Sequence, residues 1–73
     1  MDSNEIRNII TEVVIGFNVN NLEDHQTFSD AGIDSLDHMN ILLYIEENIG
    51  IEIPDSDVDK CNSIENIKSY INK

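Results

Sequence analysis

Apolar residues near the N-terminus of the chain recur at the spacing of an amphipathic helix. The positions that follow the i, i+3, i+4, i+7 pattern are Ile6, Ile9, Ile10, Val13 and Val14. Asp2 and Glu5 have the spacing of a capping box, and Gly16 is a typical helix terminator. The pattern predicts a first helix that opens at Asp2 and ends at Gly16.

From Phe17 to Ile33 no apolar period is sustained. Asparagines within residues 18–21 favour turns in this stretch. We therefore expect a long loop here. Its two large apolar residues, Leu22 and Phe28, are predicted to hold the loop to the core.

A second helical stretch begins near Ser35 and ends before Gly50, where glycine suits a C-terminal cap. Residues 51–54 are too few and too apolar to assign by period, so we interpret them as an extended connector. The proline that ends this connector is followed by an aspartate, a pair that marks a helix start. This predicts one short turn of helix over residues 55–60.

Asn62 and Glu65 form another capping box and predict a last helix. The apolar positions of this helix are Ile64, Ile67 and Ile71, with Tyr70 beside them. No internal repeat is visible. Together the elements indicate an all-α fold, namely a small four-helix bundle of three main helices and one short helix, with a long loop after the first helix.

The second helix has apolar residues on two opposite faces when successive residues are placed about 100° apart. The core face holds Ile41, Leu42, Ile45 and Ile49. The opposite face carries the three residues that we call the apolar stripe: Leu36, Met39 and Leu43. A helix needs only one buried face to join a bundle, so the apolar stripe is interpreted as a docking surface. The alternative is that a fourth element covers it.

Length and charge limit the classes of function. Seventy-three residues suffice for one core, so we expect a single domain over residues 1–73, free-standing because residue 1 is methionine and a helical pattern reaches residue 71. Fifteen acids against four bases give a formal net charge of −11. Such acidity disfavours nucleic acids and anionic membranes and favours partners with basic surfaces. The alternative is that acidity only serves solubility.

The sequence shows no apolar run long enough to span a bilayer and no signal peptide. Its single cysteine, Cys61, excludes an intramolecular disulfide and a cysteine metal cluster. We therefore expect a soluble, cytoplasmic monomer without a metal ion. Cys61 is interpreted as a small buried hydrophobe, with a reactive thiol as the alternative.

Ser35 stands at the first turn of the second helix, where free N–H groups and the helix dipole favour a phosphate ester. Taken alone, this position favours a plain N-cap, a role that serine often has. Ser35, Asp37 and His38 include the residue types of a hydrolase triad, but adjacent helical residues diverge instead of converging. His38 is therefore interpreted as a packed or half-exposed residue rather than a base.

Asp55, Asp57 and Asp59 are similar to the start of a calcium-binding loop. The sixth position of such a loop should be glycine and is Lys60, and the twelfth should be glutamate and is Asn66. A specific calcium site is therefore not expected.

The hexapeptide GIDSLD at residues 32–37 and the pentapeptide IEIPD at residues 51–55 resemble those of acyl carrier proteins, with an acidic helix between them. The resemblance covers about residues 6–71. In that family the serine, here Ser35, carries a 4′-phosphopantetheine arm attached by a phosphopantetheinyl transferase, and the arm holds an acyl group as a thioester. The resemblance implies a non-catalytic carrier and displaces the N-cap interpretation of Ser35.

By the same resemblance, the acidic helix docks to basic surfaces of partner enzymes. The implied docking residues are Asp34, Leu36, Asp37, Met39, Leu43, Glu46 and Glu47. Tyr44 flanks them as a surface residue or a further contact. The resemblance also places Ile53 and Cys61 near the mouth of a cavity that shelters an acyl chain. The implied cavity walls are Leu42, Ile45, Ile53, Val58 and Cys61.

Some positions depart from the family pattern. Asn40 and Asn48 stand where fatty-acid carriers usually have glutamates. These departures weaken the case for the housekeeping fatty-acid carrier and leave room for a dedicated carrier in a specialised pathway. The resemblance as a whole implies acyl cargo from fatty-acid, polyketide or related specialised biosynthesis, exchanged with loading and condensing enzymes. An aminoacyl or peptidyl carrier is the alternative, although such carriers usually have two glycines where this chain has Gly32 and Ile33. An acidic interaction module without a prosthetic group is the alternative from another class.

Overall fold

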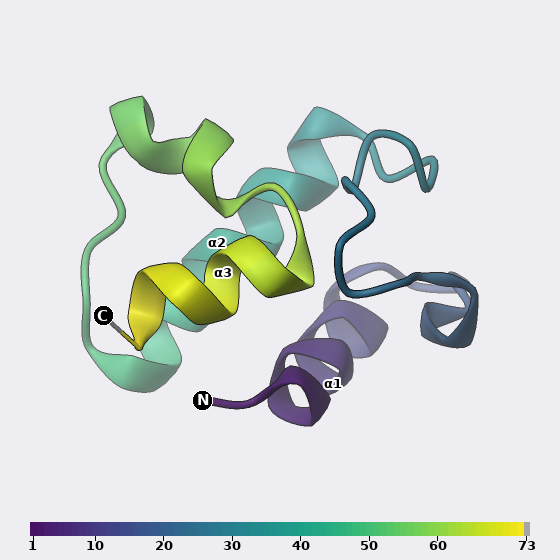
Figure 1. The fold of residues 1–73 in the computed structure, drawn as a ribbon, viewed down its shortest axis with the longest axis horizontal. Helices are drawn as coiled ribbons and strands as arrows, with labels where there is room; N and C mark the ends of the chain where they lie inside the picture. The colour runs from purple at the N-terminus through teal and green to yellow at the C-terminus, as the bar shows by residue number, and fades with distance from the viewer. Residues whose placement is uncertain (73) are drawn as a thin grey trace.

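The computed structural model describes residues 1–72, which form helices and loops without strands. The α-helices are α1 (Ser3–Val13), α2 (Ser35–Ile49) and α3 (Ile64–Ile71), and the 3₁₀-helices are η1 (Val19–Asn21) and η2 (Asp55–Cys61). Figure 1 shows α3 in front of α2, with the long loop after α1 at one side. The predicted all-α class, with three main helices and one short helix, is confirmed, and η1 is an additional turn inside the predicted loop.

Helix α1 begins as predicted but ends early. The Asp2 carboxylate caps it by accepting a hydrogen bond from the Glu5 N–H at 2.9 Å. The helix ends at Val13, not at Gly16, because the chain turns at Val14 and Gly16 adopts φ 83° in the turn that follows. Three consecutive β-branched residues, 13–15, are weak helix formers and favour this earlier end.

The long loop is fixed to the rest of the molecule by buried apolar side chains and by hydrogen bonds. Leu22 and Phe28 are buried in the core, which confirms that they anchor the loop. In addition, the Arg7 guanidinium reaches over from α1 and donates to the carbonyl oxygens of Val19 and Leu22 at 2.9 and 2.8 Å. It also pairs with the Asp24 carboxylate.

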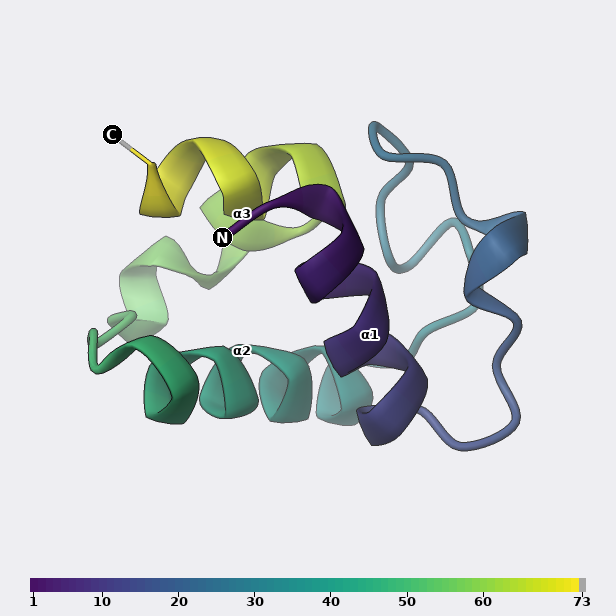
Figure 2. The ribbon, with the colours of Figure 1, turned by 90° about the horizontal axis from the view of Figure 1, so that it is seen from below.

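Helix α2 has the predicted bounds, and the structure identifies both of its caps. Asp34 is the N-cap, and Gly50 is the C-cap with φ 70°. In Figure 2, α2 lies along one side of the molecule and α3 along the opposite side, and α1 packs against both. The predicted core face is buried, with Ile49 half-buried at its end.

The start of α3 differs from the prediction. Ser63, not Asn62, is the N-cap: its hydroxyl accepts a hydrogen bond from the Asn66 N–H at 3.1 Å. Ser63 has the extended backbone of an N-cap, with φ −150° and ψ 165°, whereas Asn62 has φ −101° and ψ 9°. The Glu65 N–H donates to the Asp24 carbonyl at 2.8 Å, so a loop contact also fixes this end of the helix.

Residues 51–54 form neither helix nor strand, and Pro54 has the extended backbone that the prediction requires, with φ −62° and ψ 152°. The short helix that follows is confirmed, although it is a 3₁₀-helix and runs one residue further, to Cys61. Asn72 Nδ2 donates to the Met1 carbonyl at 3.2 Å, so the two ends of the described chain are adjacent. No helix within residues 1–72 has the length and hydropathy required to cross a membrane.

Candidate functional site

Ser35 is the first residue of α2 and is exposed to solvent. The capping role at this helix end belongs to Asp34, whose carboxylate accepts from the Asp37 N–H at 2.8 Å. The Asp34 carbonyl accepts from the His38 N–H at 3.0 Å. Within residues 1–72 no hydrogen bond engages the Ser35 hydroxyl, so it is available for chemical modification.

A depression of about 200 Å³ adjoins Ser35. Its lining comes from the long loop, the start of α2, and the end of η2 with the residue after it: Phe28, Ser29, Ile33, Asp34, Ser35, His38, Asp59 and Asn62. Asp34 holds the N–H groups of Asp37 and His38, so the N–H groups of Ser35 and Leu36 remain in the first turn of α2 to favour an anion, such as a phosphate ester on Ser35. The serine and its surroundings therefore fit a phosphate-linked group.

His38 links α2 to η2. Its Nε2 atom lies 2.8 Å from the Cys61 carbonyl oxygen. A carbonyl can only accept, so Nε2 carries the proton and donates. The His38 ring also meets the Phe28 ring edge to face, with centroids 5.1 Å apart. These two contacts confirm the interpretation of His38 as a packed, half-buried residue. They account for the position of the ring without a role as a base for Ser35.

The apolar stripe is open to solvent. Leu36, Met39 and Leu43 are 69%, 36% and 50% exposed. The alternative that another element covers the stripe is therefore wrong for the described residues. The acids around it are exposed at Asp34 and Glu47 and half-buried at Asp37 and Glu46, and α2 contains no lysine or arginine. That partners dock here stays a prediction.

The predicted wall residues of the acyl cavity are packed together. Leu42, Ile45, Ile53 and Cys61 are buried in the core, and Val58 is half-buried against it. The burial of Cys61 confirms its interpretation as a small buried hydrophobe. A chain could enter this part of the core only if the wall residues separated, so the acyl cavity stays a prediction.

Two tyrosine hydroxyl groups donate hydrogen bonds to carboxylates of neighbouring helices. The Tyr44 hydroxyl on α2 donates to Glu12 on α1, and this hydrogen bond raises the Tyr44 pKa. The Tyr70 hydroxyl on α3 donates to the Asp57 carboxylate on η2 at 2.7 Å, which raises the Tyr70 pKa to about 12. Tyr44 is thus a half-exposed surface residue beside the apolar stripe.

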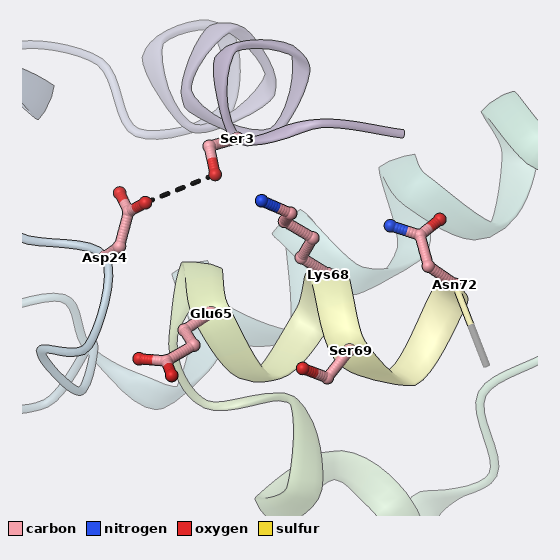
Figure 3. Close-up of a pocket in the computed structure, with 6 residues that line it drawn as sticks. All are labelled: Ser3, Asp24, Glu65, Lys68, Ser69 and Asn72. Atoms are coloured by element: carbon pink, nitrogen blue, oxygen red, sulfur yellow. Dashed lines mark hydrogen bonds between the residues drawn. The ribbon is translucent and has the colours of Figure 1, made fainter.

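A larger depression, of about 480 Å³, lies between the start of α1, the long loop and α3. Figure 3 shows Lys68 extending from α3 towards the start of α1, and the Ser3 hydroxyl donating to Asp24 at 3.2 Å. This depression shares no residue with the surroundings of Ser35. Its lining side chains carry charged, hydroxyl and amide groups, and they add nothing to the site at Ser35.

Comparison with known proteins decides the family. A model of the family described as phosphopantetheine attachment site matches residues 4–71. The chain belongs to this family. It is a family of non-catalytic carriers, so the predicted family and the predicted cofactor class are both confirmed.

Similar proteins of this phosphopantetheine family include a mitochondrial acyl carrier protein of Dictyostelium discoideum, 49% identical over 64% of this chain. An acyl carrier protein of Campylobacter hominis is 44% identical over 66% of the chain. A mitochondrial acyl carrier protein of Neurospora crassa is 37% identical over 97% of the chain. The matches cover 39%, 61% and 57% of these proteins, so the chain spans about half the length of the relatives.

The sequence pattern missed three features of this region. The folded chain shows that His38 bonds to Cys61 and that Asp34 is the N-cap of α2. It also places Asn62 in the depression beside Ser35. Of these, only the cap had a local signal, because aspartate is a preferred N-cap residue.

Proposed function

We propose that the protein is a carrier that holds acyl intermediates on a 4′-phosphopantetheine group attached to Ser35 and delivers them to partner enzymes. The observation that carries this proposal is the exposed Ser35 hydroxyl at the start of α2, which has no structural role because Asp34 caps the helix. When attached, the group supplies a terminal thiol that holds the acyl chain as a thioester.

The residues around Ser35 would assist in two ways. The first-turn N–H groups of α2 offer donors to a phosphate on the serine oxygen, and the adjoining depression gives room for it. The acids of α2 and the exposed apolar stripe would meet enzymes with basic, partly apolar surfaces. The partners proposed are a phosphopantetheinyl transferase and the loading and condensing enzymes of a biosynthetic pathway.

For the pathway, we propose fatty-acid, polyketide or related specialised biosynthesis. The GIDSLD segment supports acyl cargo, and the unusual residues Asn40 and Asn48 favour a specialised pathway over the housekeeping fatty-acid one. An aminoacyl cargo is the competing proposal, and it would be supported if aminoacyl-loading enzymes acylate the modified protein while acyl-loading enzymes do not. The single carrier domain over residues 1–73 and the cytoplasmic location also stay predictions.

The attachment site is tested by intact-mass measurement after incubation with coenzyme A and a broad-specificity transferase. The protein should gain one phosphopantetheinyl unit, and Ser35→Ala should gain none. Ser29→Ala is the matched control, because Ser29 is exposed and lines the same depression. Ser29→Ala should still gain one unit.

Modification of Ser35→Ala would show that another residue carries the group. If the unaltered protein gains no mass while a known carrier in the same reaction does, the carrier proposal is wrong. The acidic interaction module then becomes the better interpretation.

A further inference from the structure

Helix η2 is weakly anchored along most of its length. It has seven residues of 3₁₀ geometry, although such helices seldom exceed three or four residues. Of these seven residues only Cys61, at the C-terminal end, is buried. The N-terminal end, at Pro54, has no side-chain cap. An element with so little buried surface is expected to open locally at low cost.

The C-terminal end of η2 is fixed. Cys61 is fully buried, and its carbonyl accepts the His38 hydrogen bond from α2. The next residue, Asn62, accepts a hydrogen bond from the Phe28 N–H at 2.9 Å through its carbonyl. A movement of η2 would therefore turn about Cys61 and Asn62, and the part that moves would be residues 55–60.

The middle of η2 is tied to α3 by the hydrogen bond from the Tyr70 hydroxyl to Asp57. Helix α3 is itself fixed, because Ile64 and Ile67 are fully buried. Asp57 directly precedes Val58, the half-buried residue of η2 that packs against the core. While the hydrogen bond is made, Val58 cannot move out without breaking it or displacing α3.

We propose that the hydrogen bond between Tyr70 and Asp57 is a latch that keeps η2 closed on α2 and so determines how long an apolar chain must be to enter between them. This inference rests on the proposed function. A tyrosine hydroxyl is protonated at neutral pH, and the hydrogen bond to Asp57 raises the pKa of Tyr70 further, to about 12, so the donor is in place.

The latch makes the entry of an acyl chain between η2 and α2 depend on the length of that chain. Burial of one methylene favours the sheltered state about fourfold. Loss of a hydrogen bond to a charged acceptor favours the open state of η2 about 10- to 100-fold. Without the latch, a chain that is about two to three methylenes shorter should therefore be able to enter. Chains that are too short, or polar cargo, would stay outside the closed protein.

The latch itself is tested by hydrogen exchange on the unmodified protein. Tyr70→Phe removes the hydroxyl and keeps the ring. We expect the amides of residues 55–60 to exchange about 10- to 100-fold faster, with the Asp57 N–H, bonded to the Pro54 carbonyl at 2.8 Å, as the main probe. Amides in the middle of α1 should be unchanged.

Tyr44→Phe is the matched control, because it removes the same hydroxyl from a carboxylate hydrogen bond between α1 and α2. It should leave exchange in residues 55–60 unchanged. If Tyr70→Phe leaves these amides as slow as in the unaltered protein, or accelerates amides of α1 to the same degree, the latch is refuted. Because no prosthetic group is involved, this failure would leave the carrier proposal intact.

The effect on chain length is tested on the modified protein loaded with acyl chains of increasing length. For each variant, the melting temperature is compared with that of its own unacylated form. The shortest chain that raises the melting temperature should be about two to three methylenes shorter in Tyr70→Phe than in the unaltered protein or in Tyr44→Phe. Equal thresholds in all three proteins would overturn the inference.

Discussion

Removal of the Arg7 guanidinium should lower the free energy of unfolding more than any other single charge change in this protein. Arg7 is three-quarters buried and makes two hydrogen bonds to loop carbonyls, at 2.9 and 2.8 Å, besides its ion pair with Asp24. The substitution Arg7→Met keeps most of the aliphatic side chain and removes all of these bonds. The connection between residues 7 and 24 would be lost, and the hydrogen bond from Ser3 to Asp24, at 3.2 Å, would remain between α1 and the loop.

The magnitude follows from the three contacts. A hydrogen bond to a charged group contributes about 1.5–3 kcal/mol, and the lower end applies here because water can reach the freed loop carbonyls. The half-exposed ion pair with Asp24 adds at most about 1 kcal/mol. We expect a loss of about 2–4 kcal/mol at pH 7, which corresponds to a fall of about 10–25 °C in melting temperature for a domain of this size.

The assay is thermal unfolding at pH 7, with Lys60→Met as the control. The control loses the same charge, but Lys60 itself is largely exposed and its ion pair is with the neighbouring Asp57, at 3.3 Å. The control should therefore change the free energy of unfolding by less than about 1 kcal/mol. If Arg7→Met melts within the range of the control, the loop contacts of Arg7 contribute nothing and the reasoning fails.

The pH dependence supplies a second check. The hydrogen bond from Arg7 lowers the Asp24 pKa below its ordinary value of 3.8 in the folded protein. A depressed folded-state pKa contributes stability above the unfolded-state pKa, and this contribution is lost as the pH falls through the folded-state pKa. The difference in stability between Arg7→Met and the unaltered protein should therefore narrow below about pH 4 without vanishing, because the two carbonyl contacts remain. A difference that widens on acidification would contradict this assignment.

Three further predictions concern the carrier role and the fold. Replacing Asp37, Glu46 and Glu47 together by lysine should slow transferase turnover strongly, and added salt should reproduce part of that loss. Association rates that do not depend on salt would count against electrostatic docking. An octanoyl form should melt higher than the bare phosphopantetheine form, because each buried methylene contributes about 0.8 kcal/mol; equal melting temperatures would favour exposed or polar cargo. Ser63→Ala should destabilise the protein by about 1 kcal/mol in urea unfolding, since Ser63 caps α3, whereas Asn62→Ala should cost less if the capping assignment is right.

The sequence alone determined the features that depend on residues within one or two helical turns. The helical period predicted α1, α2 and α3, and the Asp2 cap and the Gly50 terminator needed only their neighbours. The second apolar face of α2 also followed from the period, and the fold leaves it exposed. The proposed attachment residue, Ser35, was predicted from a local motif, the segment GIDSLD at residues 32–37.

Only the tertiary structure decided the features that join distant parts of the chain. Asn62 and Ser63 are both suitable caps by sequence, but the Phe28 N–H holds the Asn62 carbonyl and the Glu65 N–H is held by Asp24, which leaves Ser63 to begin α3. The bonds from His38 to Cys61 and from Arg7 to the loop span 23 and 12 to 17 residues. No local period specifies such pairs, because they form only when packing of the apolar faces has brought the elements together.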